Sequence, residues 1–428
     1  MSERSPEVAV AVNARLPAGL FDRALLAADW LAVAAAMSLP WSTSASGILI
    51  ALWLIVLLPT LNLAMVRREL MTPEGGLPVL LWLIAALGML WADVAWMERL
   101  DGLGGFHKLL MIPLLLAQFR RSGHGRWVVV GFFVSAAVML AISWGLALIP
   151  GLPWRGHRNA VGVPVKDYIV QSEIFTILAL GLLGLVAELW RQGQRERALL
   201  FAGLAALFLA NVLYVATGRT TLIIVAALLL LFGFRQFGWR GMIATALAGA
   251  VIAGVAWASS PYLRGRVNAG VEEFEMYSRD NRTSMGLRLD FWKYSIPFIV
   301  EAPVIGHGTG MIEQVFERAQ AADPGVPSTR NPHGQIFTVG IQLGLIGTAV
   351  LLAMWFAHLA LFGGATLPAW FGLTVVASLI VGSVVNSHIG DFTQGWIYVF
   401  GVGVIGAMVG RRAAGQAPGF WAAGSNGS

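Results

Sequence analysis

Three side chains in the second half of the sequence have the types and settings that phosphate and proton chemistry require. Arg219 lies in a short Thr-Gly-Arg-Thr link between two apolar stretches, and Arg288 precedes Trp292 by about one helical turn. His333 is flanked by a proline and a glycine, which favour a turn. An arginine can hold phosphate through paired hydrogen bonds, and a neutral imidazole accepts a proton near neutral pH. A surface histidine, a solvated helix face or an arginine that reaches lipid headgroups is the simpler alternative.

A second group of basic side chains lies in one link between apolar stretches, residues 150–168, beside Trp154. Basic residues on the less favoured side of a membrane carry an insertion cost, which suggests a use for them. An anionic ligand such as a lipid diphosphate or a phosphorylated sugar would bind there, and headgroup contact is the alternative. The group consists of Arg155, His157, Arg158 and Lys166.

Other polar side chains give weaker indications. His388 and Asp391 flank a late link and could orient a neighbouring group. The glycine-rich segment 306–310 precedes a predicted helix, where backbone amides can bind an anion, but it lacks the Lys-Ser/Thr pair of a P-loop, and a flexible hinge explains it equally well. The acidic run at 272–275 predicts a solvated helix face, and no metal-ligand spacing is present. Acidic residues within or beside apolar stretches would pair with Arg or Lys, or line a polar cavity; they are Asp29, Asp93, Glu173 and Glu188.

The composition indicates where these residues must lie. Hydrophobic residues make up 57% of the 428 residues and charged residues only 12%, whereas soluble domains average about 45–50% and about 25%. The chain is therefore predicted to be an all-α polytopic membrane protein. The sequence contains no cysteine, which excludes disulfides, a thiolate nucleophile and a Cys-ligated metal. The net charge of +6 comes from basic residues that flank apolar stretches and does not form a nucleic-acid-binding patch.

Stretches of about 20 mostly apolar residues predict membrane-spanning helices, and the sequence contains about twelve. The first lacks a cleavage site, so we expect it to stay as an anchor. The fourth is short and contains Lys108 and Pro113. The spans are predicted at 22–40, 45–64, 77–95, 105–118, 127–149, 169–190, 197–216, 220–237, 241–259, 335–361, 367–388 and 393–410.

The distribution of Lys and Arg predicts the direction of these spans. Fifteen lie in the N-terminal tail, alternate links and the C-terminal tail, whereas five lie in the opposite short links. Because basic residues concentrate on the cytoplasmic side, both termini are predicted to be cytoplasmic, as an even number of spans requires. The predicted parts are an N-terminal membrane region (1–259), one long external loop (260–334), a C-terminal membrane region (335–410) and a cytoplasmic tail (411–428).

The long loop contains two amphipathic stretches with helical spacing of apolar residues, at about 286–300 and 310–322. Such helices lie on a membrane surface or cover a cavity. Pro297 is expected to kink or end the first of them.

In their order, these features resemble those of the bacterial O-antigen ligase family. The short link at Arg219, the Gly-Leu-Arg with a following Trp at 286–292, the Pro-x-x-Gly-x-Gly segment at 303–308, and His333 with the later Gly-Leu-Ile-Gly at 344–347 carry the resemblance. One departure is that glycine follows His333 where many relatives have asparagine, while Asn331 precedes it. This departure does not argue against the superfamily, but it makes a ligase harder to distinguish from a polymerase.

The resemblance implies a metal-independent, cofactor-free, inverting glycosyltransferase at the periplasmic face of the bacterial inner membrane. It would transfer O-antigen polysaccharide from undecaprenyl diphosphate to a sugar hydroxyl of lipid A–core in lipopolysaccharide biosynthesis. Arg219 and Arg288 would stabilise the leaving diphosphate, and His333 would accept the hydroxyl proton. Trp292, Asn331 and the basic group in the link 150–168 would bind substrate.

Three alternatives stay open. An O-antigen polymerase or a protein O-oligosaccharyltransferase of the same superfamily would share these features, although the short link at 150–168 favours a ligase. A lipid-linked glycan transporter or flippase would use the acidic residues within spans for coupling. The sequence has no clear pair of broken helices, which are typical of such transporters, and the long one-sided loop is unusual for them.

Overall fold

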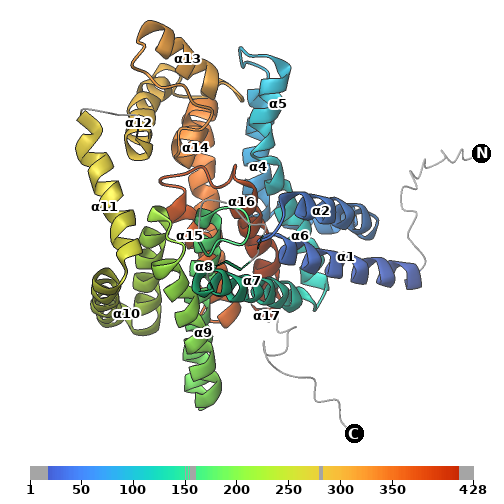
Figure 1. Cartoon of the computed structure of the whole chain (residues 1–428). Coiled ribbons are helices and arrows are strands. Elements are labelled where there is room, and N and C mark those ends of the chain that lie inside the picture. The colour runs from blue at the N-terminus through green and yellow to red at the C-terminus, as the bar shows by residue number, and fades with distance from the viewer. Residues whose placement is uncertain (1–17, 150, 153, 155–160, 279–282, 414–428) are drawn as a thin grey trace, which may run out of the picture.

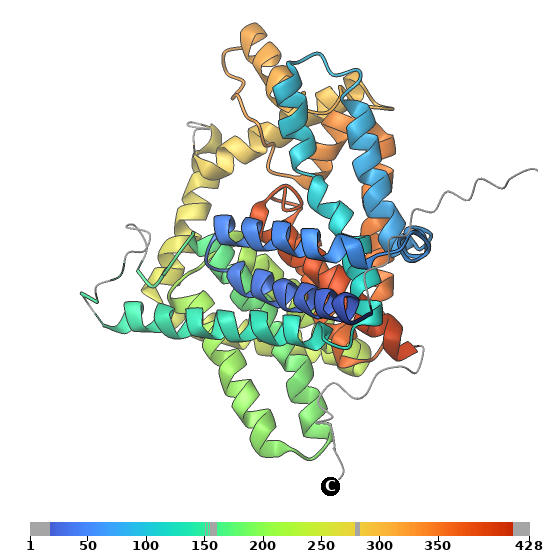
Figure 2. The same ribbon diagram turned by 90° about the vertical axis from the view of Figure 1, so that its right-hand side faces the viewer.

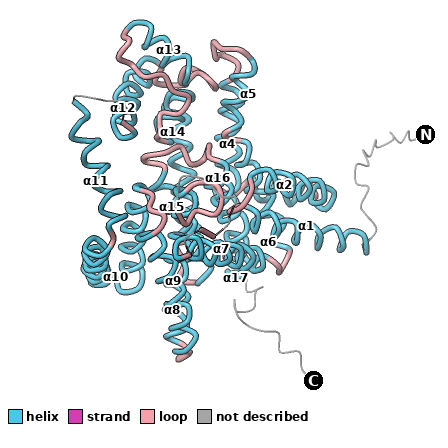
Figure 3. The backbone as a smooth tube through the Cα atoms, viewed as in Figure 1, coloured by secondary structure: helices cyan, strands magenta, loops and turns pink. Residues whose placement is uncertain are grey.

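The computed structural model describes residues 18–149, 151–152, 154, 161–278 and 283–413. This part of the chain consists of helices and the loops between them, with no strand among the described residues (Figures 1 and 3). The predicted all-α class is therefore confirmed. The α-helices are α1 (Ala18–Ser38), α2 (Thr43–Leu57), α3 (Leu63–Leu70), α4 (Pro73–Gly88), α5 (Trp96–Gly104), α6 (Met111–Arg121), α7 (Gly125–Leu148), α8 (Tyr168–Arg191), α9 (Arg195–Tyr214), α10 (Arg219–Ser259), α11 (Pro261–Glu275), α12 (Ser284–Glu301), α13 (Ile312–Ala322), α14 (Gln335–Leu361), α15 (Leu367–Gly382), α16 (Phe392–Phe400) and α17 (Gly406–Ala413). Short 3₁₀ turns are η1 (Leu58–Thr60), η2 (His107–Leu110) and η3 (Met276–Ser278), and η4 (Gly401–Ile405) is a π-helical turn.

Seven helices of the described residues are long and apolar enough to cross a membrane, or up to nine if each of two bent pairs is one span. The bent pairs are α3 with α4, at 88°, and α5 with the helix that starts at η2, at 51°. α15 is apolar but has only 16 residues, which rise about 24 Å against a hydrocarbon core of about 30 Å. These helices indicate a multi-pass membrane protein, and they do not confirm the predicted count of twelve spans.

α10 covers two of the predicted spans, 220–237 and 241–259, with a sharp break between them at Gly238. This residue has φ 63° and ψ −150°, which glycine adopts without steric cost. A Cβ atom on Gly233 would lie 2.4 Å from the carbonyl oxygen of Gly241, so the backbones on the two sides of the break touch. The glycines thus allow two adjacent apolar stretches to form a tight helical hairpin.

The helices pack around two apolar cores. The larger core is built mainly from α1, α6, α8, α15 and the η4 segment, and α1 lies between α2 and α7 (Figure 2). The smaller core joins α12 and α13 to the segment that follows α4, through buried residues that include Ala92, Phe291, Phe298 and Phe316. Figures 1 and 2 show α5, α12 and α13 together at one end of the molecule. We call α12 and α13 the α12–α13 lobe.

The two helices predicted in the long loop correspond to α12 and α13. α12 continues through Pro297 as far as Glu301, so the expectation that this proline could end the helix is wrong. The smaller core explains why the helix continues, because Phe298, directly after the proline, packs edge-to-face on Phe316 of α13 with ring centroids 5.0 Å apart.

α14 is interrupted at Gly344, which has φ 63° and ψ −158°. The amides of residues 307 and 308 donate to the carbonyls of residues 341 and 342 at 2.9 and 3.0 Å. On the other side of the break, the amides of residues 345 and 346 donate to the carbonyls of residues 303 and 304 at 2.8 and 3.2 Å. The segment 303–308 therefore completes the hydrogen bonding of a broken helix. The alternatives raised for its glycines, an anion site or a flexible hinge, do not fit this arrangement.

Substitution of Gly344 by alanine tests the importance of this break. A Cβ atom would lie 2.5 Å from the backbone of Val304, and this combination of φ and ψ costs residues other than glycine about 1–3 kcal/mol before any clash. We expect Gly344→Ala to lower the thermal unfolding midpoint of the purified protein by several degrees. Gly254→Ala in α10 is the control, because a Cβ atom there meets nothing within 4 Å. Equal midpoints for the two variants would contradict this account of the break.

Candidate active site

A polar cavity of about 840 Å³ lies where distant segments of the chain meet. Four of the residues predicted to form the site line it: Lys166, Arg288, Asn331 and His333. They come from the link before α8, the first turns of α12 and the turn before α14. The fold therefore brings basic groups and an imidazole to one cavity. The lining also includes Trp41, Thr43, Asp167, Asn386, Asp391 and Thr393.

The turn before α14 fixes the backbone of His333. This residue has φ 52°, in the left-handed region that side chains other than glycine rarely adopt. Its amide donates to Asn331 Oδ1 at 2.9 Å, and Ser387 Oγ donates to the same oxygen at 2.7 Å. Trp292 Nε1 donates to the carbonyl oxygen of His333 at 3.0 Å. Asn331 and Trp292, both predicted to bind substrate, thus hold the histidine backbone in a strained conformation, as is common at functional sites.

The imidazole of His333 has one nitrogen engaged and one available. Nδ1 lies 3.1 Å from Asn386 Oδ1, so it carries the proton and donates it, which leaves the lone pair on Nε2. Nε2 has no hydrogen-bond partner among the described residues. The ring stacks on Phe291, with centroids 5.9 Å apart. Burial, and also the charge of Arg288, lowers the pKa of His333 below its usual 6.5, so the ring is neutral at pH 7 and can accept a proton.

Arg288 is a half-buried cation at the cavity. Within the described part of the chain, its guanidinium makes neither a hydrogen bond nor an ion pair. Burial is the main cause that lowers the pKa of Arg288, and the charge of Arg219 also lowers it. The two guanidinium groups are therefore close enough to repel each other. A desolvated guanidinium without a carboxylate partner is suited to bind an anion.

Arg219 does not line the cavity. It begins α10, and its Nη1 lies 3.0 Å from Glu273 Oε2 on α11. The same glutamate oxygen accepts from the amide of Met285 at 3.0 Å, in the first turn of α12. Both contacts contribute to lowering the pKa of Glu273, against the opposing effect of its burial. Arg219 therefore fixes the start of the helix that carries Arg288. The prediction of a wholly solvated acidic face at 272–275 is wrong for Glu273.

Lys166 contributes a second cation to the cavity. Like His333 it has a positive φ, 58°. Its Nζ donates to the carbonyl oxygen of Leu39 and to Thr393 Oγ1, the latter at 2.7 Å, so one of its three donors is left for a ligand. Burial lowers its pKa to about 8, against the opposing charge of Asp167. The other three basic residues predicted in this link, Arg155, His157 and Arg158, lie outside the described residues.

The segment between α15 and α16 (residues 383–391) contributes contacts that the sequence did not predict. Asn386 orients the imidazole of His333, and Ser387 supports Asn331. Lys108 Nζ donates to the carbonyl oxygens of Gly390 and Asp391 at 3.0 and 2.7 Å. The signal available in the sequence is a group of polar residues at 383, 386–388 and 391 within an otherwise apolar C-terminal region.

His388 lies in this segment and is almost fully buried between two carboxylates. Its Nε2 lies 3.2 Å from Glu173 Oε1 on α8, and its Nδ1 lies 2.9 Å from Asp391 Oδ2. Burial alone would lower the pKa of His388, but the two carboxylates outweigh it and raise the pKa to about 9. Glu173, expected to pair with Arg or Lys or to line a polar cavity, is thus paired with a charged histidine. No three His, Asp or Glu side chains of the described residues group in a way that could hold a metal ion.

Comparisons with known proteins agree with the family suggested by the sequence. Residues 204–352 match a family model described as O-antigen ligase. This range includes Arg219, Arg288 and His333, whereas Lys166 and Asn386 lie outside it. The chain is also 25% identical, over 256 residues, to an uncharacterized protein of Haemophilus influenzae. That match covers 57% of this chain and 61% of the relative, so the chain spans about three fifths of the relative's length.

Replacement of His388 tests whether it is the buried cation of the site. Removal of one partner from a buried ion pair typically destabilises a protein by about 3–5 kcal/mol, so we expect His388→Gln to unfold far more readily than wild type at pH 6. Because the folded-state pKa is raised, this contribution is complete below about pH 6.5 and is lost as the pH rises through about 9. Unfolding in detergent at several pH values measures the difference between the two proteins.

The control for this experiment is His107→Gln, because His107 is exposed. It should match wild type across the same pH range. A stability gap between His388→Gln and wild type that stayed constant from pH 6 to pH 10 would show that the charge on His388 is not what stabilises the site.

Proposed function

We propose that this chain, whose residues 204–352 match the O-antigen ligase family model, is a lipopolysaccharide glycosyltransferase of the membrane. It transfers O-antigen polysaccharide from undecaprenyl diphosphate to a sugar hydroxyl of lipid A–core. The observation that carries the proposal is the pairing, at one cavity, of the Arg288 guanidinium with Nε2 of a neutral His333, neither of which has a hydrogen-bond partner among the described residues.

The reaction requires one bond to form and one to break at the anomeric carbon of the donor. The acceptor hydroxyl oxygen attacks this carbon from the face opposite the diphosphate, and its proton passes to Nε2 of His333. The bond between the anomeric carbon and the diphosphate oxygen breaks, and the diphosphate leaves with the electron pair. Such a displacement inverts the anomeric centre. A positioned base typically contributes about 10²–10⁴-fold to the rate.

Negative charge grows on the diphosphate as this bond breaks, and the cations at the cavity are arranged to meet it. In the described part of the chain no carboxylate pairs with Arg288, and Lys166 has one donor left for a phosphate oxygen. A fixed donor that stabilises developing charge is typically worth about 2.7–4 kcal/mol. Arg219 acts through Glu273, which fixes the first turn of α12. We therefore assign Arg219 a positioning role in place of the direct contact expected from the sequence.

The donor enters already activated, so these residues suffice for a reaction without metal or cofactor. The concentration of Lys and Arg on alternate links supports cytoplasmic termini, and the cavity then faces the periplasm of the inner membrane. The same residues would serve a polymerase or a protein O-oligosaccharyltransferase, which differ in the acceptor. A product gel of lipopolysaccharide distinguishes them, because loss of a ligase leaves core without O-antigen while polymer accumulates on the carrier lipid.

We expect His333→Ala and Arg288→Ala to reduce transfer by at least about 100-fold, because one removes the base and the other removes a donor to the leaving diphosphate. Arg288→Lys should recover only part of the activity, since a lysine cannot form the paired contact. The measurement is transfer of carrier-linked glycan to lipid A–core by purified protein without an ion gradient. A transporter would give no product in this assay.

Two exposed residues provide matched controls. Arg330 is 79% exposed and pairs with Glu313, and His107 is also exposed. Arg330→Ala and His107→Ala should retain transfer. Near-normal activity of His333→Ala or Arg288→Ala would remove that residue from the mechanism, and strong inhibition by EDTA that a divalent ion reverses would defeat the metal-free reaction.

The dependence of the rate on pH should have two limits. His333 must be neutral, and because its pKa is lowered, activity is complete at pH 7 and falls only as the pH drops below about 6.5. Lys166 must be charged, so activity falls as the pH rises through about 8. In Lys166→Arg the upper limit should move to higher pH, because a guanidinium stays charged. An unchanged upper limit in this variant would show that another group sets it.

A further inference from the structure

Four residues at the polar cavity carry groups that the proposed reaction does not use. Trp41, Thr43, Asp167 and Gln394 line the cavity, and they come from the turn between α1 and α2, the start of α2, the residue before α8 and the first turn of α16. We propose that these four residues, which we call the sugar subsite, bind the first sugar of the donor, the ring that is attached to the diphosphate. This inference deepens the proposed function and rests on it.

Trp41 supplies an aromatic ring to the cavity. Its Nε1 donates to Ser135 Oγ on α7 at 2.8 Å, so the indole has no N–H left for a ligand and offers only its ring atoms. The face of an aromatic ring is electronegative, and it attracts the C–H bonds on one face of a sugar, which are polarised positive. Phe392 also lines the cavity, but Nζ of Lys166 lies over its ring at 5.9 Å. Within the described lining, Trp41 is thus the aromatic ring best placed to stack on a sugar.

The position of Trp41 is fixed before any ligand binds. Its amide donates to the carbonyl oxygen of Ser38 at 2.9 Å, which closes the turn that follows α1, and Pro40 restricts the backbone of this turn. The carbonyl oxygen of Leu39 in the same turn accepts from Nζ of Lys166. A ring that is already held in place loses little conformational freedom when it binds a ligand, so it suits recognition of a sugar ring of fixed shape.

The other three residues of the sugar subsite can bond to hydroxyl groups. The amide of Gln394 and the hydroxyl of Thr43 make no hydrogen bond within the described residues. Asp167 Oδ1 accepts from the amides of Ile169 and Val170 at 2.8 and 2.9 Å, which leaves Oδ2 for a ligand. These groups provide donors and acceptors together, as a sugar hydroxyl requires because it both donates and accepts. The carboxylate also repels a phosphate, so this part of the cavity favours an uncharged ligand.

The location of the sugar subsite favours the sugar next to the diphosphate. Lys166, which has one donor left for a phosphate oxygen, directly precedes Asp167 and holds the turn that contains Trp41. A diphosphate bound by Lys166 and Arg288 would therefore bring the sugar attached to it within reach of Trp41. The cavity volume of about 840 Å³ lies within the range of about 300–1,000 Å³ for pockets that hold whole ligands of drug size, so it accommodates more than a diphosphate.

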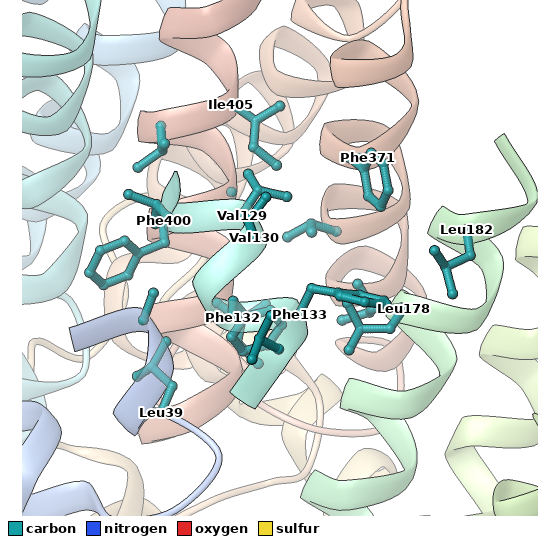
Figure 4. A pocket seen from close by; sticks show the side chains of 18 of the residues that line it. Leu39, Val129, Val130, Phe132, Phe133, Leu178, Leu182, Phe371, Phe400 and Ile405 are labelled. Carbon is teal, nitrogen blue, oxygen red and sulfur yellow. The ribbon is translucent and has the colours of Figure 1, made fainter. Parts of the chain in front are cut away.

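A second cavity, of about 280 Å³, lies between α7, α8, α15 and α16 and is not suited to a sugar. Figure 4 shows apolar side chains converging on it, with Phe132, Leu178 and Phe371 among them. These side chains offer no hydrogen bond to a hydroxyl group, and burial of a hydroxyl without a partner is unfavourable. Of these two cavities, the polar one is therefore the one that suits a glycan.

The test measures how much the sugar adds to the affinity of purified protein for the carrier. The probes are undecaprenyl diphosphate and the same carrier with one repeat unit of the glycan, and the ratio of their dissociation constants is the gain from the sugar. We expect Trp41→Leu, which replaces the ring with an apolar side chain, to lower this gain by about tenfold, equivalent to about 1.4 kcal/mol. Trp41→Phe should keep most of the gain, because it retains an aromatic face.

Gln394→Met provides a second variant and should also lower the gain. It keeps the length of the side chain, and the amide that it removes has no partner within the described residues, so the fold should tolerate it. Trp144→Leu is the matched control, because Trp144 is half-buried on α7, donates through Nε1 to the carbonyl oxygen of Leu207 and lines neither cavity. It should keep the wild-type gain.

A second pair of probes, lipid A and lipid A–core, separates the donor from the acceptor. If Trp41→Leu lowered the gain between these two and left the gain for the carrier unchanged, a sugar of the acceptor would lie at Trp41 and the inference would be overturned. A wild-type gain for the carrier in both Trp41→Leu and Gln394→Met would overturn it too. Wild-type protein that shows the gain, loses it in Trp41→Leu and yet transfers no glycan would overturn the proposed function and leave the sugar subsite intact.

Discussion

The candidate site depends on a buried histidine held between two carboxylates. His388 lies within 3.2 Å of Glu173 and 2.9 Å of Asp391, so it ties the segment 383–391 to α8. Loss of one partner from an ion pair that is cut off from water strongly destabilises a protein. Displacement of this segment from α8 is therefore strongly unfavourable. The orientation of the His333 imidazole follows from it, because Asn386 in the same segment fixes the tautomer of His333.

Different parts of the chain therefore contribute different groups to the site. The part that matches the family supplies the guanidinium groups and the imidazole, at Arg219, Arg288 and His333. Segments outside it supply the second cation, Lys166, and the groups that orient the imidazole. His333 and Lys166 both adopt a positive φ, so the fold imposes backbone strain on two of the groups that face the cavity. Such backbone conformations persist only where the surrounding packing holds them in place.

Much of this arrangement could be predicted from residue types and spacing. Composition indicated a helical membrane protein, the apolar spacing at 286–300 and 310–322 indicated α12 and α13, and turn-forming neighbours singled out His333. The spacing of residues in the sequence could not predict which side chains contact each other in the folded chain. Nothing in the sequence shows that Glu273 pairs with Arg219, or that Asn386 reaches His333. Hydropathy also cannot show that an apolar stretch ends early or bends, as at α15 and between α3 and α4.

The break in α14 restricts how the α12–α13 lobe can move. Its backbone connection at 303–308 supplies the missing hydrogen bonds of residues 341, 342, 345 and 346, and residues 341 and 342 are buried. Movement of the lobe away from α14 would leave these backbone groups without hydrogen-bond partners, at a free-energy cost of about 1–3 kcal/mol for each. The α12–α13 lobe is therefore held in a fixed position relative to α14. Under the proposed reaction, both lipid substrates must therefore reach the polar cavity without displacing the lobe from α14.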